Sequence, residues 1–80
     1  MSYRPFVEEL VRSVVEYPDS VEITEEVDGV VRTFYVRVHP DDNGKVIGKS
    51  GRVVTAIRQV VSAVASKSRE KAFVKIQTED

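Results

Sequence analysis

The chain has 80 residues, of which 41% are hydrophobic and 31% are charged, and it contains no cysteine. This size and composition are typical of one globular domain with a thin core, and the lack of cysteine excludes disulfides, thiolate metal sites and a cysteine nucleophile. No apolar run approaches the roughly 18 residues of a membrane-spanning helix, and the N-terminal segment lacks the apolar stretch of a signal peptide. We therefore expect a cytoplasmic protein without membrane contact.

The formal net charge of −1 hides a strong asymmetry along the chain. Residues 1–42 carry 4 basic and 10 acidic side chains, a net charge of −6, whereas residues 43–71 carry 7 basic and 1 acidic, a net charge of +6. Unless this clustering arises by chance, it makes one part of the surface attractive to a polyanion while the rest repels it.

The N-terminal segment has the pattern of an amphipathic helix. Pro5 suits the first turn of a helix, because its missing N–H has no partner there. Apolar side chains then recur at three- and four-residue spacing from Phe6 to Val15. Tyr17 precedes Pro18 and so avoids the helical conformation, which predicts that the helix ends there.

Two strands joined by a tight turn are predicted next. Residues 20–27 alternate apolar and polar side chains, as a half-buried strand does. Asp28-Gly29 follows and is a strong hairpin signal. A second alternating strand covers roughly residues 31–38, and His39-Pro40 ends it.

Glycines divide the following helical region into two parts. Asp41 or Asp42 is expected to cap a short helix that reaches Ile47. Gly48 and Gly51 interrupt the helical pattern and predict a single tight turn.

A longer helix, a loop and a strand complete the chain. The helix carries an apolar stripe, the polar segment from Ser66 to Lys71 is expected to form a loop, and Phe73 to Ile76 a last strand. The apolar stripe consists of Val54, Ile57, Val61 and Val64, with Val53 and Val60 beside it.

The predicted order is therefore helix, strand, strand, helix, helix, strand. The hairpin makes the first two strands antiparallel, and the helix pair is long enough for a right-handed crossover to a parallel third strand. We expect an α+β fold, a three-stranded mixed sheet with three helices packed on one face.

The glycine turn carries the clearest functional signal. Glycine lacks a Cβ atom and tolerates positive φ, so another backbone can approach the turn closely. The second helix begins at the turn and points its free N–H groups at whatever docks there. Residues 43–58 contain no acidic side chain, which suits a phosphodiester backbone. The basic side chains in or near the turn are Lys45, Lys49, Arg52 and Arg58.

This segment resembles a known family. Ile-Gly-Lys-Ser-Gly-Arg at residues 47–52, followed by Val54 and Ile57, is similar to the Ile-Gly-x-x-Gly-x-x-Ile-x-x-Ile signature of KH domains, whose loop clamps about four nucleotides. The predicted element order is that of the type II KH fold. Residues 38–49 further resemble the bacterial KhpA family of free-standing KH proteins. Val54 stands where the signature has Ile, which is a conservative departure.

The resemblance implies one KH domain over residues 1–80, in which residues 1–30 supply the N-terminal helix and first strand and residues 31–78 the core. It also implies an RNA groove between the glycine turn with its flanking helices and the wall formed by residues 66–76. The helical wall lacks aromatic residues, so bases would be held by aliphatic contacts and hydrogen bonds to their edges. The RNA-binding residues expected on this basis are Lys45, Ile47, Gly48, Lys49, Ser50, Gly51, Arg52, Val54, Arg58, Lys67, Arg69 and Lys71.

The resemblance also implies partners and a cellular role. Single-stranded RNA is the expected ligand, and the family suggests a homodimer or a heterodimer with a larger KH protein of the Jag type. RNA-chaperone activity or post-transcriptional regulation, with effects on cell shape and cell-wall organisation, is the implied role. The alternative is a protein-interaction module on the same scaffold, with a dimer surface marked by Val53 and Val60 or by Tyr3, Tyr17 or Tyr35.

Other chemistries find little support in the sequence. Gly48-Lys49-Ser50 suggests a nucleotide-binding P-loop, but three residues separate Gly44 from Gly48 where that motif has four. His39 is the only histidine and is better suited to capping a turn than to binding a metal. Residues 41–44 lack calcium-loop spacing. We expect no enzyme and no cofactor, because no nucleophile–base set, carboxylate pair or cofactor motif is present.

Overall fold

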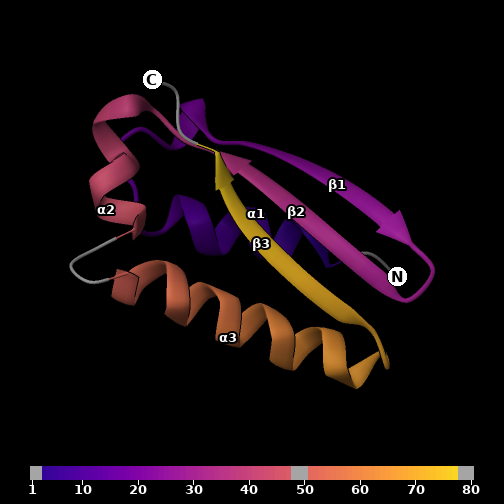
Figure 1. The fold of residues 1–80 in the computed structure, drawn as a ribbon. Helices are drawn as coiled ribbons and strands as arrows, with labels where there is room; N and C mark the ends of the chain where they lie inside the picture. The colour runs from indigo at the N-terminus through magenta and orange to yellow at the C-terminus, as the bar shows by residue number, and fades with distance from the viewer. Residues whose placement is uncertain (1–2, 48–50, 78–80) are drawn as a thin grey trace.

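The computed structural model describes residues 3–47 and 51–77, and for Lys45 and Ile47 the backbone alone. Within these residues, the short 3₁₀ helices η1 and η2 accompany the helices and strands that Figure 1 labels. In chain order the elements are α1 (Arg4–Arg12), η1 (Pro18–Ser20), β1 (Glu22–Asp28), β2 (Val31–Arg37), η2 (Pro40–Asp42), α2 (Asn43–Ile47), α3 (Arg52–Lys67) and β3 (Lys71–Gln77).

The three strands form a mixed sheet in the order β1-β2-β3. β1 and β2 are antiparallel and joined at Gly29, whose φ of 62° is the left-handed conformation that favours glycine. β3 pairs with β2 in parallel, with Phe34 opposite Val74. The predicted strand directions are therefore confirmed, and β3 is an edge strand.

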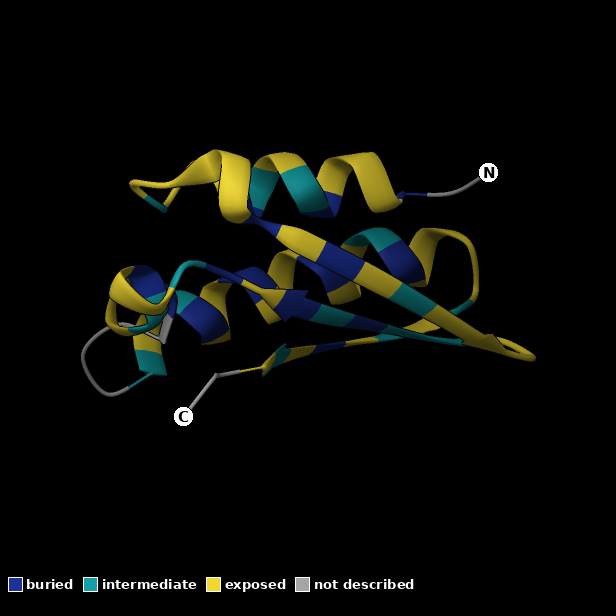
Figure 2. Ribbon diagram, turned by 90° about the horizontal axis from the view of Figure 1, so that it is seen from above, coloured by how far each residue is buried: buried dark blue, intermediate teal, exposed yellow. Residues whose placement is uncertain are grey.

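Two helices cover one face of the sheet. In Figure 1, α1 lies behind the strands and α3 runs alongside β3, and the two helices contact each other on the same side of the sheet (Figure 2). The expectation of three helices on this face is not met, because α2 has only five residues and contacts mainly α3 and η2. None of the helices in the described ranges has the length and apolarity needed to cross a bilayer.

The core lies between these helices and the sheet. Phe34 and Val36 project from the central strand and are fully buried, as alternation along β2 predicts. The helices contribute the matching apolar stripes that their spacing indicated. Among the helical core residues are Val7 and Val11 of α1 and Ile57, Val61 and Ala65 of α3.

α1 ends at Arg12, five residues before the predicted end at Tyr17. The reason lies far away in the sequence, in the side chain of Asp42, which is fully buried. Its two carboxylate oxygens accept hydrogen bonds from the backbone N–H groups of Glu16 and Tyr17, each at 3.0 Å. These groups are therefore satisfied outside a helix, and the chain turns into η1.

The expected helix cap at Asp41 or Asp42 is also wrong. Asp42 points into the interior, and η2 is capped by His39, whose Nδ1 accepts the Asp41 N–H at 3.1 Å. The imidazole stacks on the Tyr17 ring with 4.1 Å between ring centroids. His39 thus has the turn-capping role that the sequence indicated.

A polar cluster ties the α3–β3 connection to the sheet. Arg32 of β2 lies 2.7 Å from the Glu25 carboxylate and 3.0 Å from that of Glu70, which follows α3. Its guanidinium also lies over the Tyr3 ring, 5.4 Å from the centroid. Burial, and then the negative charge of Glu70, raise the pKa of the Tyr3 hydroxyl above its ordinary value of 10.0, so this group stays neutral at physiological pH.

Replacing Asp42 by alanine should destabilise the protein, because two backbone N–H groups would lose a charged acceptor. We expect the free energy of unfolding to fall by about 2–3 kcal/mol, measured by urea denaturation. Asp41→Ala is the matched control, since the Asp41 side chain is 73% exposed and its loss should change stability by less than about 0.5 kcal/mol. Equal effects of the two substitutions would contradict this role for Asp42.

Candidate nucleic-acid interface

The turn between α2 and α3 is described from Gly51 onward. Gly51 is the N-cap of α3 and has φ 71° and ψ 18°, a left-handed conformation of the kind that glycine tolerates. Gly48, Lys49 and Ser50 lie outside the described residues, as do the side chains of Lys45 and Ile47.

α3 presents positive charge and the N–H ends of its first backbone groups at its first turn. Its 16 residues begin with the exposed Arg52, and no acidic side chain lies in the first turn. Because the first four N–H groups of a helix have no partner within it, this end attracts an anion. The local sequence therefore produces an end of α3 suited to a phosphate group.

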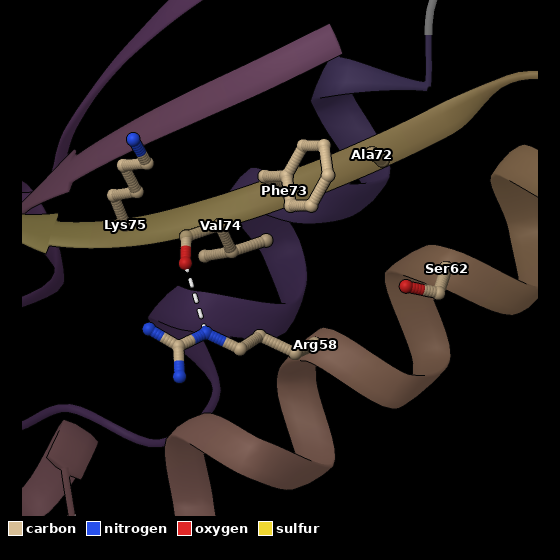
Figure 3. A pocket seen from close by; sticks show the side chains of 6 residues that line it. All are labelled: Arg58, Ser62, Ala72, Phe73, Val74 and Lys75. Carbon is tan, nitrogen blue, oxygen red and sulfur yellow. Dashed lines mark hydrogen bonds between the residues drawn. The ribbon is translucent and has the colours of Figure 1, made fainter. Parts of the chain in front are cut away.

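Arg58 connects α3 to the edge strand. Its Nε–H donates a hydrogen bond of 2.9 Å to the backbone carbonyl of Val74 in β3 (Figure 3). The bond fixes the distance between helix and strand, and it places a guanidinium beside the open edge of the sheet.

The backbone of β3 alternates between its neighbour and this open edge. Lys71 donates its N–H to the carbonyl of Val30, so the residues in phase with Lys71 face β2. In a parallel ladder the intervening residues point their N–H and C=O groups the other way, here towards the open edge. These residues are Ala72, Val74 and Ile76, and they offer donors and acceptors to a ligand lying along β3.

A groove runs between α3 and β3. One hollow of about 270 Å³ and a second of about 200 Å³ share Ser62, Ala72 and Phe73, so they form one continuous depression. Figure 3 shows the first hollow, with Arg58 and Ser62 on the helix facing the strand. The first hollow is also lined by Arg58, Val74 and Lys75, and the second by Ser66, Glu70 and Lys71.

The structure brings together only some of the residues predicted for the site. Arg58 and Lys71 line the groove from opposite walls. Lys67 and Arg69 are exposed at the end of α3 and just beyond it, without lining either hollow. Val54 is only 6% exposed, so it offers little surface to a ligand.

The connection from α3 to β3 is shorter than predicted. α3 continues to Lys67 and β3 begins at Lys71, so residues 66, 67 and 71 belong to regular structure. Arg69 closes the helix with φ 58°, and Glu70 donates its N–H to the carbonyl of Ala65 at 3.0 Å. A helix ending of this kind usually needs glycine, and because position 69 is arginine, this ending could not be predicted from the sequence.

Phe73 and Lys75 line the groove within the predicted wall of residues 66–76 but were not among the RNA-binding residues expected by name, and Ser62 was not predicted at all. The strand pattern alone places Phe73 and Lys75 on one face of β3, where they project beside the groove. Ser62 lies one helical turn after Arg58, so its position follows from helix periodicity.

Fold and groove together define a KH domain. A family model for the KH domain of KhpA and KhpB matches residues 4–76. The chain belongs to this KhpA/KhpB family.

Curated relatives agree with this assignment. The chain is 41% identical over 73 residues to RNA-binding protein KhpA of Halalkalibacterium halodurans, covering 91% of this chain and 96% of that protein. It is 43% identical to RNA-binding protein KhpA of Oceanobacillus iheyensis, over 91% and 97% of the two chains. The protein of the same name from Mycobacterium leprae is 44% identical over 76% of each chain. These names describe RNA-binding proteins and not enzymes, as expected from the sequence.

Replacing Gly51 by alanine should strain the turn. The left-handed conformation costs a residue with a Cβ atom roughly 1–2 kcal/mol, and we expect the free energy of unfolding to fall by about that amount in urea denaturation. Gly44→Ala is the matched control, because a Cβ atom there meets nothing within 4 Å and Gly44 lies in α2. A fall in stability for Gly44→Ala as large as for Gly51→Ala would contradict the assigned backbone conformation.

Proposed function

We propose that the chain binds single-stranded RNA along the groove between α3 and β3, with the RNA backbone held at the turn of residues 48–51. The observation that carries this proposal is the open edge of β3, which faces Arg58 across the groove next to the N-terminal end of α3. The names of the relatives support RNA as the ligand.

The phosphate chain would be held by charge and backbone N–H groups. Residues 43–58 carry basic and no acidic side chains, and the first turn of α3 adds its own partial positive charge. Lys45, Lys49 and Arg52 are the proposed phosphate contacts. Because such contacts carry no sequence information, they set the affinity and not the choice of RNA.

Base recognition would come from the β3 wall. Open N–H and C=O groups of β3 can bond to base edges, while Ala72 and the stem of Arg58 provide apolar contact. Arg58 already donates to the Val74 carbonyl, which leaves its terminal nitrogens to meet a base or a phosphate. Glu70 is the acidic residue in this wall, and its ion pair with Arg32 offsets its repulsion of RNA.

Several finer features belong to the same proposal. The order of helices and strands supports the type II form of the KH fold, with residues 31–78 as its core and residues 1–30 adding α1 and β1 to the single domain. We propose a cytoplasmic role as an RNA chaperone or post-transcriptional regulator, with cell shape and cell-wall organisation as the processes affected.

A single groove of this size suggests weak binding, with Kd of about 10⁻⁴–10⁻⁶ M.

An apolar surface between α1 and α3 supports the proposed dimer. A hollow of about 320 Å³ is lined mainly by aliphatic side chains, and Val14 and Val60 at its edge are 36% and 41% exposed. A second copy or a Jag-type KH protein could cover this hollow, and two linked grooves would bind RNA more tightly than one. The alternative function, a protein-interaction module, would use this surface and leave the groove empty.

The groove is tested by replacing Lys49 and Ser50 with aspartate and measuring fluorescence anisotropy of a short single-stranded RNA over a salt series. We expect at least about tenfold weaker binding and a shallower dependence on salt, because phosphate contacts are lost. Circular dichroism and the mass in solution should stay the same.

Arg12→Asp with Ser13→Asp is the matched control, since it changes the charge equally in an Arg-Ser pair at the end of α1. If this control weakens RNA binding as much as the loop variant, the effect is one of net charge and the groove proposal fails. RNA binding that neither variant changes would refute the groove proposal, and wild-type protein that binds no RNA would favour the interaction module.

A further inference from the structure

We propose that the face of the sheet opposite the helices carries a second RNA-binding surface beside β3. In this surface Phe73 and Tyr35 would stack on bases, and Lys71 and Lys75 would contact phosphates. The inference rests on the proposed function, because the RNA would reach this face after leaving the groove.

The strand pattern puts these side chains together. Phe34 and Val74 are buried against the helices, so Tyr35 and Phe73, their neighbours along β2 and β3, point to the opposite face. The register places Lys75 next to Tyr35 and Phe73 next to Thr33, so the two aromatic rings are diagonal neighbours on adjacent strands. Residues at such positions are within reach of one another when the side chains are aromatic.

This face is left open by the fold. α1 and α3 both lie on one side of the sheet (Figure 2), and no described helix covers the opposite face, on which strand alternation places Phe73. Phe73 is 50% exposed, one of the most exposed large apolar side chains among the described residues. A flat aromatic ring left half in water gains free energy when a base covers it, and every base has a face that can do so.

The charged side chains on this face favour a polyanion and determine where it can lie. On this face β3 carries Lys71 and Lys75, whereas β1 carries Glu22, Glu26 and Asp28. A polyanion is therefore attracted to the β3 side and repelled from the β1 side, which confines it to a line along β3.

The Tyr35 ring already has two charged neighbours on this face, one acidic and one basic. The Tyr35 hydroxyl donates a hydrogen bond of 3.2 Å to Glu26, and the Lys75 ammonium lies 5.9 Å from the centroid of the Tyr35 ring. The ring is thus anchored on its acidic side while a cation lies over it on the β3 side. A base with its phosphate could occupy the space next to Lys75, because cation and ring would contact the two parts of one nucleotide.

The open face is continuous with the groove. Phe73 and Lys75 line the rim of the groove, and Figure 3 shows both projecting from β3 on the side away from Arg58. The helical wall of the groove provides no aromatic ring, so Phe73 is the first stacking partner that an RNA leaving the groove would meet. The groove accounts for about four nucleotides, and the nucleotides beyond them would pass over the edge strand.

The test compares RNAs of about four and about ten nucleotides, the shorter sufficient for the groove alone. Phe73→Ala and, separately, Tyr35→Leu should weaken binding of the longer RNA by roughly 5- to 100-fold in fluorescence anisotropy, the effect typical of losing one stacked base. Binding of the shorter RNA should change by less than about twofold in Tyr35→Leu, because Tyr35 lines neither hollow of the groove. Phe73→Trp should bind the longer RNA about as tightly as the wild-type protein does, because tryptophan keeps an aromatic ring at this position. Phe6→Ala is the matched control, because Phe6 is 42% exposed on α1 and should have no effect.

Distinct results separate this proposal from the groove proposal. If both RNAs weaken equally in the Phe73 variant and Tyr35→Leu has no effect, Phe73 acts only within the groove and the second surface is refuted. If neither substitution affects the longer RNA but they alter the mass of the protein in solution, the face contacts protein and not RNA. Wild-type protein that binds neither RNA would overturn the proposed function itself.

Discussion

The parallel pairing of β3 with β2 is the constraint on which the candidate site depends. Because the two strands run in the same direction, the chain must cross from one end of the sheet to the other, and α2, the glycine turn and α3 make this crossing. The burial of Val61 and Ala65 then holds α3 along the edge strand. The same packing produces the groove and places Arg58 across it from β3. It also brings the basic segment of residues 43–71 to one edge of the sheet, while the acidic β1 lies at the other edge.

Much of the fold follows from local sequence, and the exceptions have distant causes. Strand alternation and the Asp28-Gly29 turn predict β1 and β2 correctly, because their side chains face either core or solvent. The end of α1 could not be predicted, since the carboxylate of Asp42 holds the backbone after α1 from 25 and 26 residues away. The extra length of α3 was missed because Arg69 adopts a left-handed conformation without being glycine.

The candidate site was predictable where it depends on backbone conformation and less so where it depends on packing. Gly51 was expected at a tight turn in which glycine can take positive φ, and the structure gives it a positive φ there. Val54 stands at an isoleucine position of the family signature, yet it is almost fully buried, so an aliphatic residue at this position reflects the core at least as much as the ligand. Phe73 looked like an ordinary strand residue, because only the pairing of β3 at the edge reveals that its ring is exposed.

The central claim is that RNA lies along the groove between α3 and β3. The most direct measurement is a titration of ¹⁵N-labelled protein with single-stranded RNA, followed by the chemical shifts of the backbone amides. The account predicts the largest changes in residues 51–58 and 71–76, around the start of α3 and along β3, with little change in residues 6–12 of α1. Changes concentrated on α1 and the apolar side of α3, or no change in residues 71–76, would contradict it.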